Sequence, residues 1–176
     1  MTPSKPRRDS IDRFIETALP LFPMLDPEVE AAVDRMTKLV KHIDRLTERT
    51  VSEFGLNTGE FRLLLKLRQA PEQRATAGEL AERVSLSTGA MTNRLDGLEE
   101  AGLIERTRDP HDRRSVLVTI TDTGIEVLAR AVDAQAREEQ KLIGTLAPQD
   151  QRRLNALLRQ LILATEDERA ADLTRS

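Results

Sequence analysis

Small polar side chains occupy one side of a predicted helix that begins after Ser87. Apolar residues at spacings of four and three mark its inward face, so the small side chains face outward. Asparagine can bond adenine, threonine can contact the methyl group of thymine, and glycine lets the backbone approach a phosphate. An ordinary capped surface helix has the same pattern, so the helix alone leaves both interpretations open. The candidate DNA contacts of this reader helix are Ser87, Thr88, Gly89, Thr92 and Asn93.

A basic loop follows between two stretches of strand-like composition, 103–107 and 115–120. At the tip of such a hairpin, or wing, guanidinium groups can enter a narrow minor groove or clamp its phosphates. A neighbouring carboxylate can orient one of them by an ion pair. A solvated charged turn is the alternative interpretation. The candidate DNA contacts of the loop are Arg108, Asp112, Arg113 and Arg114, with Asp112 as the orienting acid.

Helix signals on either side of these residues indicate the elements that position them. Thr76 and Glu79 have capping-box spacing and predict a short helix that ends near Val84. Ser87 can cap the next helix, and Gly102 can end it. A short helix, a turn, a capped helix and a basic hairpin together indicate a winged helix-turn-helix, and Thr76 joins the candidate DNA contacts.

Two apolar stripes elsewhere in the chain need a partner. One runs along a long helix from about Pro27 to Phe54, which another helix follows from Asn57 or Thr58. The other lies on a helix that Pro148 opens. The fold class is therefore mainly α with a small β-hairpin. We expect a disordered leader (1–10), N-terminal dimerisation helices (11–56), a winged helix-turn-helix region (57–124), C-terminal dimerisation helices (125–165) and a tail (166–176).

Composition argues against several classes of function. The chain has 176 residues and no cysteine, which removes disulfides, thiolate catalysis and iron–sulfur clusters. His42 and His111 lie far apart, and no Walker A loop, dinucleotide fingerprint or G-x-S-x-G elbow is present. We therefore expect neither an enzyme nor a cofactor or metal site. No apolar run approaches the length of a membrane span, and we expect a cytoplasmic protein.

The net charge of −3 by itself opposes binding to nucleic acid. Even the segment 74–114 holds seven arginines against eight acidic residues. Any DNA affinity must therefore come from a few well-placed cations and from the free amides at the start of the reader helix.

The sequence resembles the MarR family of bacterial transcriptional regulators. The segment DPHDRRSVLVTITDTG, from Asp109 to Gly124, matches the family pattern of Asp-x-Arg, an apolar strand and Leu-Thr-x-x-Gly, with Ile120 in place of the usual leucine. The segment 79–106 resembles the helix pair of the family. The resemblance implies a homodimer with interlocking terminal helices and a pseudo-palindromic operator whose half-sites lie about 34 to 36 Å apart. It also implies repression that a small, often aromatic anion relieves.

Within this family, the chain is most similar to the urate-responsive subgroup. Arg94 and Arg106 match two of its sensing arginines, whereas the chain has no tryptophan and carries Arg62 where the subgroup has an acidic residue. Although Arg62 departs from the subgroup, these three arginines can together form a basic pocket for a carboxylate or phenolate, since arginine forks suit planar anions. The alternative is that they form salt bridges with Asp96, Glu99 or Glu105.

Three functions remain as hypotheses. The first is a ligand-responsive repressor whose partners are double-stranded DNA, a second copy of the chain and a small anionic effector. The second is a winged-helix adaptor that binds protein through the same face, which the acidic balance favours. The third is an enzyme, although the sequence offers no nucleophile beside a base.

Overall fold

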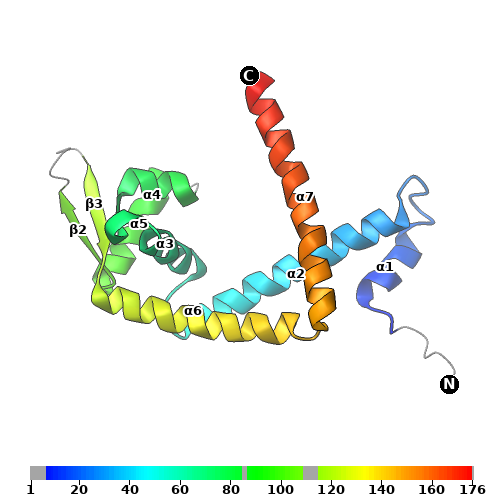
Figure 1. Cartoon of the computed structure of the whole chain (residues 1–176), viewed down its shortest axis with the longest axis horizontal. Coiled ribbons are helices and arrows are strands. Elements are labelled where there is room, and N and C mark those ends of the chain that lie inside the picture. The colour runs from blue at the N-terminus through cyan, green and yellow to red at the C-terminus, as the bar shows by residue number, and fades with distance from the viewer. Residues whose placement is uncertain (1–6, 85–86, 109–114, 176) are drawn as a thin grey trace. The chain divides into compact units, whose positions relative to one another are not determined.

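The computed structural model divides into two compact units, residues 1–128 and residues 129–176 (Figure 1). It describes residues 7–84, 87–108 and 115–175. The predicted fold class, mainly helical with a small sheet, is confirmed. Its elements are α1 (Ser10–Ala18), α2 (Pro27–Ser52), α3 (Thr58–Arg68), the 3-10 helix η1 (Pro71–Gln73), β1 (Arg74–Thr76), α4 (Ala77–Val84), α5 (Thr88–Glu100), β2 (Ile104–Arg108), β3 (Val116–Ile120), α6 (Asp122–Ile143) and α7 (Pro148–Arg175).

Helix α1 begins at Ser10 because a capping box closes its N-terminus. The Asp9 carboxylate accepts hydrogen bonds from the amides of Ile11 and Asp12 at 2.8 and 2.9 Å. In return, the Asp12 carboxylate accepts one from the amide of Asp9 at 2.9 Å. The predicted disordered leader (1–10) therefore differs from the structure at its end, since Asp9 is a cap and Ser10 is helical.

Local signals also set the boundary between α2 and α3. Asp26 caps α2 in front of Pro27, the first residue of the helix. After α2 ends, Gly55 turns the chain with a φ of 72°, a left-handed conformation that suits glycine. Asn57 then forms a capping box with Glu60. This decides between the two caps that the sequence leaves open.

The two strands of the wing, β2 and β3, belong to a three-stranded antiparallel sheet of order β1-β3-β2. Ile104 on β2 lies opposite Ile120 on β3, and Ala75 on β1 lies opposite Val118 on the other side. The sequence does not predict β1, because three residues are too few for an alternating pattern. Since β1 leads directly into α4, the sheet connects the start of the helix-turn-helix with the wing.

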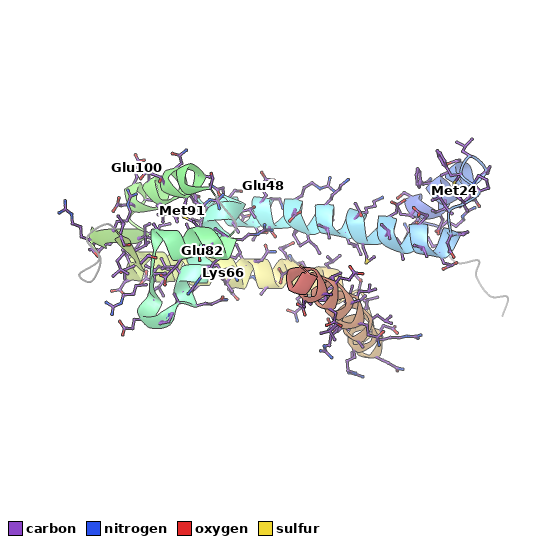
Figure 2. The ribbon with its side chains drawn as sticks, turned by 90° about the horizontal axis from the view of Figure 1, so that it is seen from above. Met24, Glu48, Lys66, Glu82, Met91 and Glu100 are labelled. Carbon is purple, nitrogen blue, oxygen red and sulfur yellow. The ribbon has the colours of Figure 1, made fainter. Side chains whose placement is uncertain are left out.

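The core of the first unit lies where α3, α4 and α5 pack with this sheet, which we call the reader lobe. Met91, Leu95 and Leu98 of α5 are at most 2% exposed, which confirms the predicted inward face of the reader helix. Leu64 of α3 and Val118 of β3 are fully buried in the same lobe. Figure 2 shows Met91 among the helices of the lobe and Glu100 on its outer side.

The second unit contains α7, which extends beyond the predicted tail. The sequence places a tail at 166–176, whereas α7 continues to Arg175. This stretch has no glycine or proline and is rich in alanine, glutamate and arginine, which favour a helix. In the described part of the chain, no helix combines the length and the apolar character that a membrane span requires.

Both predicted apolar stripes remain uncovered in the single chain. The exposed residues of the α2 stripe are Val29, Val33, Met36, Val40 and Ile43, and Leu39 is exposed beside them. The exposed residues of the α7 stripe are Leu157, Leu158, Leu161 and Ile162, and the following Leu163 is exposed as well. Long contiguous apolar surfaces are unusual on a monomer in water, so each stripe is a candidate contact with another chain.

Candidate nucleic-acid interface

The N-terminal half of α5 presents the residues that the sequence assigns to DNA bases. Ser87 caps the helix through its hydroxyl, as predicted, and Thr88 is the first helical residue. Gly89, Thr92 and Asn93 are exposed on the side opposite the buried face. No acidic residue lies in the first turn, so the positive potential of the helix N-terminus is available to a phosphate.

The surface in front of Gly89 is open. Among the described residues, no atom lies within 4 Å of a Cβ placed on this glycine. Packing against that part of the chain therefore gives no reason for a glycine here. The close approach of a DNA phosphate stays a prediction for this position.

Thr76 lies where β1 meets α4 and forms the predicted capping box. Its amide donates to the Glu79 carboxylate at 2.8 Å, and its hydroxyl accepts from the Glu79 amide at 3.2 Å. The hydroxyl also donates to the same carboxylate at 3.0 Å. Thr76 therefore orients the helix that precedes the reader helix, and its direct contact with DNA stays a prediction.

Thr121 joins the end of the reader helix to the end of the wing. Its hydroxyl donates to the Gly102 carbonyl at 2.8 Å and accepts from the Gly124 amide at 3.0 Å, while its own amide donates to the Leu103 carbonyl at 3.1 Å. A Cβ on Gly124 would overlap that Leu103 carbonyl and approach Ile120 to 2.9 Å. A threonine hydroxyl that accepts the amide three residues later is a helix-cap signal, and Thr121 uses it at the start of α6 (Asp122–Ile143). The contacts of Thr121 with Gly102 and Leu103 are long-range and cannot be predicted from this spacing.

Arg106 ties the first wing strand to the far end of the reader helix. Its Nη1 lies 2.7 Å from the Asp96 carboxylate, and its Nη2 pairs with Glu99. Its Nε and its backbone amide also donate to Glu99, at 2.8 and 3.2 Å. The side-chain hydrogen bond from Arg106 lowers the pKa of Glu99 below its ordinary value, and the same bond raises the pKa of Arg106. The salt-bridge alternative is thus observed for this arginine.

We predict that replacing Glu99 with glutamine lowers the melting temperature at neutral pH. Because the folded state depresses the pKa of Glu99, its carboxylate stabilises the fold above the ordinary value of 4.5. That stabilisation is lost as the pH falls through the lower pKa of the folded state. The melting temperatures of the wild type and E99Q should therefore converge in acid. Scanning calorimetry over this range tests the prediction, with the neighbouring, exposed E100Q as the control; a gap that persists in acid would contradict it.

The three arginines assigned to a ligand have three different sets of neighbours. Arg62 lies 3.3 Å from Asp44 of α2, and both side chains are exposed. Arg94 reaches from α5 to the first turn of α3, where a Cβ on Gly59 would overlap its guanidinium. Within the described residues, no hydrogen bond or ion pair engages Arg94. Arg94 is therefore the member of the set whose charge is available to an anion, whereas Arg106 already holds two carboxylates.

Arg108 is the last residue of β2, is exposed and lies opposite Val116. Asp112, Arg113 and Arg114 lie outside the described residues, so their contacts with the minor groove stay predictions.

In the part of the chain that the structure describes, no cluster of histidine and acidic side chains could hold a metal ion.

Comparisons with known proteins agree with this architecture. The family model described as the MarR family matches residues 56–116. The multiple antibiotic resistance protein MarR of Salmonella typhimurium is 30% identical over 120 residues, which are 68% of this chain and 82% of that protein. The HTH-type transcriptional regulator PecS of Dickeya dadantii is 28% identical over 137 residues, 77% of this chain and 82% of PecS. A mutant MarR from E. coli, solved in complex with operator DNA, has a TM-score of 0.62 at 26% identity and covers 82% of this chain and 96% of its own.

Proposed function

This chain belongs to the MarR family of transcriptional regulators, and we propose that it is a homodimeric repressor that leaves a pseudo-palindromic operator when a small anionic ligand binds. The exposed, acid-free start of α5 is the observation that carries the DNA-binding part of the proposal. Its free amides can hold a phosphate, while Asn93 and Thr92 can reach base edges in the major groove. The similarity of this chain to the mutant MarR from E. coli that was solved with operator DNA supports this mode of binding.

The acidic balance of the chain is compatible with this proposal. Asp96 and Glu99, which follow the DNA-facing turns of α5, are engaged by Arg106. Their negative charge is therefore partly neutralised before a phosphate approaches. The cations that remain for DNA are few, Arg108 and the loop arginines among them, so a single reader lobe would bind weakly.

Dimerisation therefore has a functional reason. Two linked reader lobes convert the second half-site contact into an intramolecular event, which can raise affinity by roughly two to four orders of magnitude. The uncovered stripes of α2 and α7 supply the apolar surface that a stable homodimer buries. We propose that both stripes contact the second copy.

Arg94 is the proposed centre of the effector site. An anion at its guanidinium would lie where α5 meets the first turn of α3. Arg62 could join it by leaving its exposed pair with Asp44, which is held weakly in water. Arg106 is already paired with two carboxylates. We therefore expect the effector, a planar carboxylate or phenolate monoanion, to act mainly through Arg94.

A DNA titration tests the proposal directly. A duplex enriched from a random pool with the full-length chain should bind with an affinity that falls as salt rises, because phosphate contacts release counterions. Salicylate, benzoate and urate should be tested as probes that release the duplex from the wild type and not from R94Q. If no duplex is enriched at low salt, the DNA-binding function is wrong and the protein-binding adaptor takes its place. If DNA binds and none of the three anions releases it, the effector part fails alone.

We predict that N93A changes which sequences bind, while R114A weakens binding to all of them. Losing the Asn93 contact should cost about 1 to 3 kcal/mol at one base position and relax the preference there. Losing a phosphate contact at Arg114 should lower the salt slope by about 1 with the dimer intact. Anisotropy titrations of single-base operator variants separate the two effects. Uniform weakening by N93A would contradict base reading by this residue.

A further inference from the structure

A cavity of about 340 Å³ lies between α1 and α2, within the first unit and away from the reader lobe. Residues of the N-terminal turn of α1 and of the middle of α2 form its walls. None of its lining residues belongs to the DNA or effector contacts proposed above, and it precedes the segment 56–116 that matches the family model. Its volume falls within the range of about 300 to 1,000 Å³ that is typical of small-molecule sites.

The lining of this cavity combines apolar and basic side chains. Ile11 of α1 and Leu39 of α2 contribute the apolar side chains. Lys38, His42 and Arg45 follow at spacings of four and three along α2, so their side chains share one face of the helix. A molecule that fills this space therefore meets hydrocarbon and positive charge together.

The cations of this face keep their charge available. Lys38 donates to the Ser10 hydroxyl, and Arg45 donates from Nε to the Lys41 carbonyl at 3.2 Å. Both of these acceptors are neutral. Among the described residues, no carboxylate forms an ion pair with Lys38 or Arg45.

Asp9, the one acid among the described residues that line the cavity, is already engaged. The Asp9 carboxylate lies 2.9 Å from Arg35 Nε, and Arg35 also pairs with Asp12. The hydrogen bond from Arg35 holds the pKa of Asp9 at about 2, so this carboxylate stays ionised and attached to Arg35. It therefore fastens α1 to α2 beside the cavity, and the charges of Lys38 and Arg45 are not neutralised by it.

We propose that the α1–α2 cavity binds a small amphipathic carboxylate, with its hydrocarbon body between Ile11 and Leu39 and its carboxylate at Lys38 and Arg45. The apolar walls stabilise the body by removing it from water. The two cations offer charge-assisted hydrogen bonds to the carboxylate, and His42 can add one. This site is separate from the effector site proposed at Arg94, so the chain would bind two anions at two different sites.

Titration calorimetry with octanoate and the full-length chain tests this site without DNA. The wild type should bind octanoate, and octylammonium, which has the same chain and the opposite charge, should not bind. The double variant K38Q/R45Q should weaken octanoate binding at least about tenfold, since two charged contacts are lost. K41Q removes a positive charge from the same helix outside the cavity and should bind as the wild type does. I11W, which fills the cavity, should also abolish binding.

Three outcomes would overturn the proposal. The first is the absence of octanoate binding by the wild type, which is also the result expected if a second copy of the chain covers the cavity. The second is equal binding by K38Q/R45Q and the wild type. The third is loss of octanoate binding in R94Q, which would place the carboxylate at the other site. Since no DNA is present, these results are independent of whether the chain represses transcription.

Discussion

Replacing Gly124 with alanine should lower the free energy of unfolding by about 3 kcal/mol, because the new methyl group has no space. It would overlap the Leu103 carbonyl, a backbone atom that cannot rotate away, and would come within 2.9 Å of the Ile120 side chain. To make room for the methyl group, the first turn of α6 would have to move away from the end of the reader helix. That movement would strain the hydrogen bond from the Thr121 amide to the Leu103 carbonyl.

Thermal and denaturant unfolding of G124A measure this effect, which corresponds to a fall in melting temperature of roughly 6 to 12 °C. G89A is the matched control, because the same methyl group meets open space on the exposed face of α5. It should leave stability unchanged or raise it by up to about 1 kcal/mol. If Gly89 lets a phosphate approach the backbone, G89A should weaken DNA binding at the same time. Equal stability of G124A and the wild type would contradict the close packing at this joint.

Replacing Leu161 with aspartate should convert the dimer into monomers and weaken operator binding by about a hundredfold or more. The Leu161 side chain is 52% exposed in the single chain, so the substitution removes little contact within one chain. In the proposed dimer, the same position would bury an unpaired carboxylate against the second copy, which is costly. The variant should therefore keep its helical content and lose only its association.

Light scattering after size-exclusion chromatography gives the mass, and circular dichroism gives the helix content. Q160D adds the same negative charge one residue earlier on α7, outside the apolar stripe, and should remain a dimer. The proposed role of the α7 stripe is wrong if L161D stays a dimer with unchanged DNA affinity. If L161D unfolds, L161A takes its place in the test. This variant shortens the apolar side chain without introducing a charge and should weaken the dimer less than L161D does.

Most of the reader lobe follows from short-range patterns in the sequence. The inward face of α5 is set by Met91, Leu95 and Leu98, and these spacings hold wherever the helix packs. Caps are equally local, because Asn57 and Thr76 satisfy amides only a few residues away. Two features do not follow from these patterns. Strand β1 is too short to show an alternating pattern of apolar residues. The end of α7 lies beyond the predicted one, because its polar last turns contain no proline or glycine that would end the helix.

The sequence alone therefore determined the winged helix-turn-helix and the exposure of its small polar face, since periodicity and capping act between neighbours in the chain. It could not decide what Arg106 does, because a ligand arginine and a structural one look the same until Asp96 and Glu99 are placed beside it. Nor could it explain Gly124, whose missing side chain matters only because the Leu103 carbonyl lies against it. Those roles depend on contacts between segments that the chain brings together only when β2 and β3 pack against the end of α5, and only the tertiary structure supplies them.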